Sequence, residues 1–206
     1  MSRRRGLFIT LEGPEGAGKS TQARRLAGWL RRRGRKVLLT REPGGTPIGM
    51  KLRRILLDKR SGNLDPLVEL CLYEAARGEL LRRVIRPALA AGKVVVLDRF
   101  QDSTWVYQGY AGAVDRKLVE RLGTVVLAGC EPDLTLLLDL PVRRGLARVR
   151  RPNRFEAKPL RFHETVRRGY LFLSRRFPRR IRRIAADRSL QEVQDAIQRE
   201  VERFLR

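Results

Sequence analysis

The sequence predicts an α/β fold in which a parallel five-stranded sheet is flanked by helices. Three observations support this prediction. Five short apolar stretches alternate with segments whose apolar residues recur at helical spacing. A glycine-rich loop follows the first stretch, and charged or hydroxyl residues stand where other stretches end. Such alternation favours a parallel sheet covered on both faces. With no internal repeat or linker, we expect one domain over residues 1–206.

Composition limits the class of protein. With 206 residues and 42% hydrophobic content, the chain is large and apolar enough to bury a core. No apolar run approaches the roughly 20 residues that span a bilayer, and we expect no signal peptide because the first residues lack its apolar segment. Cys71 and Cys130 stand far apart without a metal-binding spacing, so we expect both to be buried and reduced in a cytoplasmic protein.

The net charge of +24 is the unusual feature of the composition. Such a charge attracts nucleotides and nucleic acids, so nucleic-acid binding is possible. The basic residues are mostly arginine and are spread along the chain rather than gathered in one block. This distribution favours a solvated basic surface, and we do not expect a nucleic-acid function.

Residues 13–20 match the phosphate-binding loop pattern, two glycines five apart followed by Lys19 and Ser20. Glycines let successive N–H groups point at phosphate oxygens, the lysine adds a charge, and the hydroxyl suits Mg²⁺. An apolar strand at 7–11 precedes the loop and a helical pattern follows it, which disfavours the alternative of a turn with an incidental lysine. The residues expected to bind ATP are Gly13, Pro14, Glu15, Gly16, Ala17, Gly18, Lys19, Ser20 and Thr21.

The other elements are predicted from apolar spacing and from residues that break helices. The longest helix has an apolar stripe through Leu67, Cys71 and Ala75, and Pro87 is expected to kink or interrupt it. The last strand is the weakest because two arginines interrupt it. Expected strands cover 37–40, 94–97, 134–138 and 181–185, and expected helices cover 48–56, 66–89, 115–127, 162–177 and a last helix that begins at a Ser189–Glu192 capping box.

Three further features bear on function. Asp98 ends the clearest strand, and an acid there, beside a phosphate loop, predicts a Mg²⁺ site shared with Ser20; a helix cap is the weaker alternative. Residues 103–110 are rich in aromatic and amide groups, which suits either substrate contact or core packing. His163 is the single histidine and has no partner signal, so we expect it to be structural.

The segment around 143–160 is rich in arginine and is interrupted by prolines. In a phosphate-loop enzyme such a segment can act as a lid that closes over the phosphates and stabilises the transferring group; a solvated basic loop is the alternative. Together the motifs predict Mg²⁺-dependent phosphoryl transfer from a nucleoside triphosphate, because positioning and charge dominate that chemistry. Spacing alone does not identify the acceptor.

The assembled motifs resemble the thymidylate kinase family. The resemblance covers Phe8 to about Ile197 and implies a P-loop nucleoside-monophosphate-kinase architecture. It also implies transfer of the γ-phosphoryl of ATP to dTMP, giving dTDP and ADP, with Mg²⁺, and assembly as a homodimer. The stretches that carry it are Glu12–Thr21, Thr40–Thr46, Tyr73–Arg77, Asp98–Phe100, Ser103 with Tyr107–Gly109, and Pro132–Asp139.

The resemblance also implies roles in binding the acceptor nucleotide. Glu15 would hold the sugar hydroxyl. Arg41, Arg77 and Arg99 would grip the phosphate, which suits the guanidinium fork. Tyr107 would pack against the deoxyribose.

For the base, the resemblance implies that Tyr73 stacks on thymine and that Ser103 and Gln108 lie nearby. The stretches Tyr107–Gly109 and Tyr73–Arg77 argue against a kinase for another nucleoside monophosphate, which is the first alternative. A nucleic-acid-binding ATPase is the second alternative, motivated by the net charge of +24. No recognition-helix or RNA-binding motif supports it.

Some family members carry an arginine inside the phosphate loop, whereas others place catalytic arginines in the lid. Gly16 and the arginine-rich lid make this chain similar to the second kind. Arg154 is the favoured phosphate-contacting lid residue. Arg148, Arg150 and Arg151 stay open, with general basicity as the alternative. The residues expected to act in catalysis are Lys19, Glu15, Arg99 and Arg154.

Overall fold

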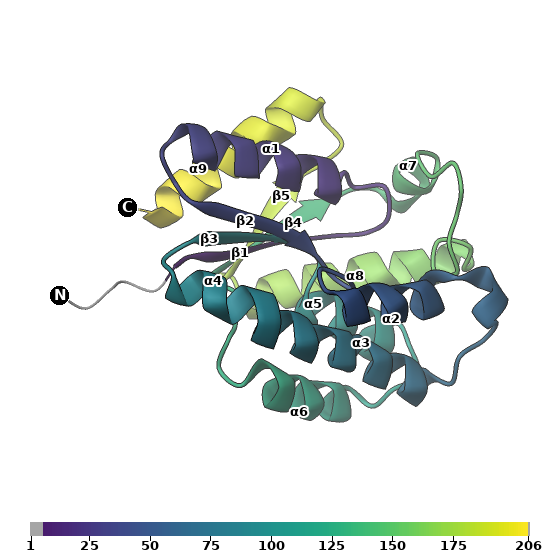
Figure 1. The fold of residues 1–206 in the computed structure, drawn as a ribbon. Coiled ribbons are helices and arrows are strands. Elements are labelled where there is room, and N and C mark those ends of the chain that lie inside the picture. The colour runs from purple at the N-terminus through teal and green to yellow at the C-terminus, as the bar shows by residue number, and fades with distance from the viewer. Residues whose placement is uncertain (1–5, 206) are drawn as a thin grey trace.

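The computed structural model describes residues 6–205 and contains one parallel five-stranded sheet (Figure 1). The strands lie in the order β2-β3-β1-β4-β5. β2 and β3 therefore lie on one side of β1, and β4 and β5 lie on the other, so the order in which strands are added reverses beside β1. In such sheets ligands bind at the carboxyl ends of the strands where the order reverses. The predicted sheet is confirmed. The strands are β1 Phe8–Glu12, β2 Val37–Arg41, β3 Val94–Asp98, β4 Leu134–Asp139 and β5 Ile181–Ala185.

Helices cover both faces of the sheet. In Figure 1, α1 and α9 lie over one face, α3, α4 and α8 lie under the other, and α6 lies outside them. The helices are α1 Lys19–Arg32, α2 Pro47–Leu57, α3 Pro66–Leu80, α4 Arg86–Ala90, α5 Gln101–Thr104, α6 Arg116–Leu127, α7 Val142–Leu146, α8 Leu160–Arg176 and α9 Leu190–Leu205, with a 3₁₀ turn at Lys59–Ser61 and π-helical turns at Leu81–Ile85 and Trp105–Tyr110.

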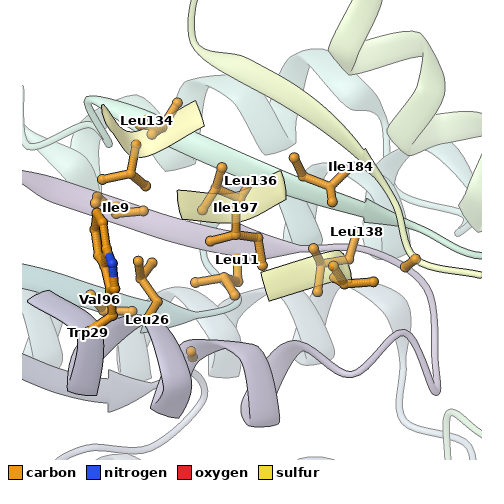
Figure 2. Packing of buried hydrophobic residues seen from close by; sticks show 14 of the residues in the cluster. Ile9, Leu11, Leu26, Trp29, Val96, Leu134, Leu136, Leu138, Ile184 and Ile197 are labelled. Atoms are coloured by element: carbon orange, nitrogen blue, oxygen red, sulfur yellow. The ribbon is translucent and has the colours of Figure 1, made fainter. Parts of the chain in front are cut away.

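The sheet is apolar on both faces, as expected of a parallel sheet between two helix layers. Alternate residues of β1 point to opposite sides: Ile9 packs against α1 and α9, whereas Phe8 packs toward α3 and α4. Figure 2 shows the first of these cores, in which Leu26 of α1 and Ile197 of α9 meet the strands. Packing on both faces therefore holds the strands in place, and with them the residues at the strand ends.

The long helix predicted over 66–89 is interrupted, as Pro87 indicated. A π-helical turn at Leu81–Ile85 separates α3 from α4, and Pro87 lies in the first turn of α4. Because proline has no N–H and crowds the preceding turn, the chain cannot continue a regular ladder there. The predicted capping box is confirmed, since the Ser189 and Glu192 side chains each accept from the other's backbone N–H, at 3.2 and 2.9 Å.

The predicted apolar stripe of α3 points outward. Leu67 is 50% exposed, and Cys71 and Ala75 are exposed too, so the prediction of a buried Cys71 is wrong; Cys130 is buried as expected. The inward face of α3 carries Leu70 and Leu80 instead.

Candidate active site

The phosphate-binding loop joins β1 to α1 and folds around Lys19. Gly13, Gly16 and Gly18 have φ angles of 141°, 68° and 85°, a region in which other residues are strained. The Lys19 ammonium donates to the Gly13 and Pro14 carbonyls at 2.9 and 2.7 Å. Burial, followed by the charge of Arg99, lowers the pKa of Lys19 to about 8. The lysine is therefore a desolvated cation held across the loop.

Ser20 and Asp98 meet where two neighbouring strands end. β1 pairs with β3 with Leu11 opposite Asp98, which brings the end of β3 beside the loop. The Ser20 hydroxyl donates directly to the Asp98 carboxylate. A hydroxyl and a carboxylate are hard oxygen donors of the kind that Mg²⁺ accepts together with phosphate and water. Among residues 6–205 no group of three or more acidic, histidine or cysteine side chains could hold a metal ion, so an ion at Ser20 and Asp98 would also need ligands from phosphate and water.

Arg99 is fixed by an unusual number of contacts. Its backbone adopts a left-handed conformation, with φ 67°, directly after β3. One terminal nitrogen donates to the Gly13 carbonyl, the Ser103 hydroxyl and the Tyr170 hydroxyl at 3.1–3.2 Å. The other donates to Glu15 at 2.8 Å. The guanidinium therefore stands beside the phosphate loop in a single orientation.

Glu15 lies beside this arginine, and both residues line the pocket described below. Glu15 also accepts from the Tyr107 hydroxyl at 2.7 Å. Burial opposes ionisation of Glu15, but the charges of Arg99 and Lys19 outweigh it, and the pKa of Glu15 lies below its usual value. An ionised carboxylate at this position can accept a hydrogen bond from a ligand hydroxyl.

Glu12 and Tyr170 form hydrogen bonds with each other and with Ser103, which lines the site. The sequence analysis assigned a role to neither. Glu12 accepts from the backbone N–H of Phe100 at 2.7 Å, from the Ser103 hydroxyl at 2.6 Å and from the Tyr170 hydroxyl at 3.1 Å. Burial and then the charge of Asp102 raise the pKa of Glu12 to about 7. The only signal in the sequence was an acid that ends a buried strand.

One open pocket brings together most of the predicted residues. Phe155 of the lid and Arg53 of α2, which the sequence analysis missed, also line it. Phe155 is buried and packs edge-on against Tyr73 and Tyr107, with ring centroids 6.1 and 5.9 Å apart. The predicted residues that line the pocket are Glu15, Gly16, Gly18, Lys19, Ser20, Thr21, Arg41, Tyr73, Asp98, Arg99, Ser103, Tyr107 and Gln108.

Arg77 does not line this pocket. Its side chain is 0% exposed and lies in an ion-pair cluster with Glu42 and Glu74. It also donates to Gln101, and to the Thr104 hydroxyl at 2.7 Å. Arg77 shares a helix face with Tyr73 as expected, yet its terminal nitrogens donate to these partners and its Nε has no partner among the described residues. The structure therefore brings Thr104, rather than Arg77, to the pocket wall.

The lid arginines lie in different places. Arg154 pairs with Glu69 and donates to the Leu56 carbonyl at 3.0 Å, outside the pocket lining. Arg148 donates to the Gly16 carbonyl at 3.2 Å, at the phosphate loop itself. Arg150 and Arg151 are exposed. In this arrangement Arg148 is a lid arginine that hydrogen-bonds to the loop.

His163 is buried in α8, and its ring meets the Phe162 ring edge-on at 5.6 Å. Neither of its ring nitrogens has a hydrogen-bond partner among the described residues.

Comparisons of sequence and of structure with known proteins give one consistent match. The family model described as "Thymidylate kinase" matches residues 11–197. The chain is 50% identical over 195 residues to a thymidylate kinase of Syntrophotalea carbinolica, covering 90% of each protein. It is 46% identical to one of Desulfovibrio desulfuricans, covering 97% of each. A crystal structure of thymidylate kinase from Ehrlichia chaffeensis superposes with a TM-score of 0.79 at 32% identity, covering 96% of this chain and 99% of that one.

Proposed function

The chain belongs to the thymidylate kinase family, and from this premise we propose that the pocket is where it transfers the γ-phosphoryl of ATP to dTMP, giving ADP and dTDP. The observation that carries this proposal is the convergence of Lys19, Asp98 and Arg99 on one pocket. Phosphoryl transfer needs charge and alignment more than covalent chemistry; Lys19 and Arg99 supply positive charge, and Asp98 supplies an oxygen ligand for a metal ion.

We assign the donor to the loop and the acceptor to the rest of the pocket. The backbone N–H groups of residues 15–21 and the Lys19 ammonium would hold the ATP phosphates at the start of α1. Arg99 and Arg41 would hold the acceptor phosphate, and Arg148 is the favoured lid residue because it already reaches the Gly16 carbonyl.

The acceptor nucleoside fits the aromatic side of the pocket. Glu15, held by Arg99 and Tyr107, would accept from the sugar hydroxyl. Tyr73 would stack on the base, with Ser103 and Gln108 nearby. Tyr107 would lie against the sugar.

We propose that Mg²⁺ binds with ATP at Ser20 and Asp98. The two side chains contact each other and offer oxygen ligands, which fits an ion that binds through one or two protein groups and the substrate phosphates. When bound, the ion would neutralise charge on the phosphates. The contribution of the chain itself is to hold both oxygens at the loop.

A coupled assay with ATP, Mg²⁺ and dTMP tests the proposed function. Turnover of dTMP that exceeds that of dCMP and AMP is expected; turnover of another monophosphate with none of dTMP would reject the substrate. Lys19→Ala should lower kcat by roughly 100-fold or more while the melting temperature stays near that of the wild type. The matched control is Lys51→Ala, because Lys51 is exposed on α2 and does not line the pocket.

We propose that the protein is a homodimer that packs through α2, α3 and α6. The support is an apolar surface on these neighbouring helices, made of Ile48, Ile55, Leu67, Val68 and Val125, each at least 44% exposed. Light scattering should give twice the chain mass, and Leu67→Glu should give monomers. An unchanged mass for this variant would reject the surface.

No helix within residues 6–205 is long and apolar enough to cross a membrane.

A further inference from the structure

Glu69 connects the lid to the wall of the acceptor pocket. One carboxylate oxygen accepts from the Gln108 side-chain amide at 2.8 Å, and the other forms an ion pair with Arg154. All three groups are shielded from water: Glu69 is 7% exposed, Gln108 is 3% exposed, and the Arg154 side chain is 10% exposed. The carboxylate thus has one partner from the lid and one from the pocket.

This arrangement fixes which end of the Gln108 amide faces the ligand. A carboxylate that is paired with an arginine only accepts hydrogen bonds, and Glu69 is paired in this way with Arg154. Gln108 must therefore turn its NH₂ group toward Glu69 and its carbonyl oxygen away. Gln108 lines the pocket, and among the described residues nothing donates to that oxygen. The pocket wall consequently presents a hydrogen-bond acceptor.

We propose that Glu69 is a positioning residue that selects the base through Gln108. This inference rests on the proposed function. An oriented acceptor matches a base edge that carries a ring N–H, as thymine and uracil do at N3. The N3 of cytosine is itself an acceptor, so placing it there would leave two acceptors facing each other. A desolvated mismatch of this kind is strongly disfavoured.

The same carboxylate ties base selection to the lid. The Arg154 side chain also donates to the Leu56 carbonyl at 3.0 Å, which anchors the lid to the end of α2. The next residue, Phe155, packs against Tyr73 and Tyr107 in the pocket. Displacing the lid therefore removes the charge that orients Glu69, so the acceptor is best oriented when the lid lies against α3.

The test compares binding of dTMP with binding of its N3-methyl analogue, which lacks the ring N–H. The wild type should bind the analogue roughly 100-fold more weakly. Glu69→Gln can donate as well as accept, so it frees the Gln108 amide to turn. This variant should reduce the discrimination to less than about tenfold. Glu69→Asp keeps an acceptor-only carboxylate and should retain most of the discrimination.

A double-mutant cycle with Gln108→Met separates positioning from general packing. If Glu69 acts through Gln108, then Glu69→Gln should change the discrimination no further in the Gln108→Met background. Full discrimination by Glu69→Gln, or equal effects of that substitution in both backgrounds, would overturn the inference. Melting temperature and KM for ATP report on folding and on the donor site. A wild type without dTMP turnover rejects the proposed function itself, whereas normal turnover with additive substitutions rejects only the role of Glu69.

Discussion

Gly16 of the phosphate loop and Gly145 of α7 meet backbone to backbone. A Cβ on Gly16 would lie 2.0 Å from the Gly145 carbonyl oxygen, and a Cβ on Gly145 would lie 2.2 Å from the Glu15 carbonyl oxygen. The start of the lid therefore sits directly on the loop, with no space for a side chain on either partner. A side chain as large as arginine at position 16 would therefore push α7 away from the loop.

We predict that Gly145→Ala separates the lid from the loop. The residue lies in α7, where alanine suits the backbone, so the cost should arise from the contact alone. KM for ATP should rise by roughly tenfold while thermal stability changes little, because misplacing a positioning element costs alignment. Gly28→Ala on α1 is the control, since its Cβ would meet only the far end of a side chain at 3.6 Å. An unchanged KM would show that the contact has no role.

Lys19 should make ATP binding depend on pH. Its pKa of about 8 means that the free enzyme loses the ammonium charge as the pH rises through that value, and ATP affinity should fall with it. Bound phosphates favour the charged form, so ATP binding near pH 8.5 should take up a proton. Calorimetry in buffers of different ionisation enthalpy measures this uptake. Lys19→Met should abolish it; uptake that persists in the variant would assign the proton to another group.

Glu12 should make the protein less stable as the pH rises, whereas an acid paired with a cation makes a protein more stable as the pH rises. Because burial raises its pKa from 4.5 to about 7, the folded protein binds the proton more tightly than the unfolded chain does. Its contribution is fully present below pH 4.5 and is lost as the pH rises to about 7, by at most about 3 kcal/mol. Glu12→Gln should flatten the pH dependence of the unfolding free energy in this window. Equal slopes for both proteins would contradict the assignment.

Tyr73 should act through its ring rather than its hydroxyl. No hydrogen bond from that hydroxyl occurs among the described residues, whereas the ring faces the pocket beside Phe155. Tyr73→Phe should keep kcat/KM for dTMP within about threefold, and Tyr73→Ala should lower it by roughly 10- to 100-fold. A large loss in Tyr73→Phe would instead reveal a hydrogen bond made only in the complex.

The parts of the site that depend on strand ends could be predicted from sequence. Lys19, Ser20 and Asp98 follow strands that the apolar pattern indicates, and parallel pairing brings such ends together without further information. The phosphate loop, the sheet and the helix interruption near Pro87 were predictable for the same reason, since each depends on local residue type.

The parts that depend on competition between side chains could not be predicted. The spacing of Tyr73 and Arg77 gives their shared helix face, but it does not show that Glu42 and Glu74 surround the guanidinium. Likewise the pattern of α3 identifies an apolar stripe without indicating whether the stripe faces the core. The pairing of Arg154 with Glu69 joins residues that are 85 positions apart, which no periodicity reports.

The contacts of Arg99 have a thermodynamic consequence for substrate binding. An arginine that is free in solution loses up to about 2 kcal/mol of rotamer entropy when it is immobilised. Here Gly13, Ser103, Tyr170 and Glu15 have already immobilised it as the chain folds. A phosphate that arrives at this guanidinium does not have to freeze it again, so that loss is absent from the affinity for the acceptor.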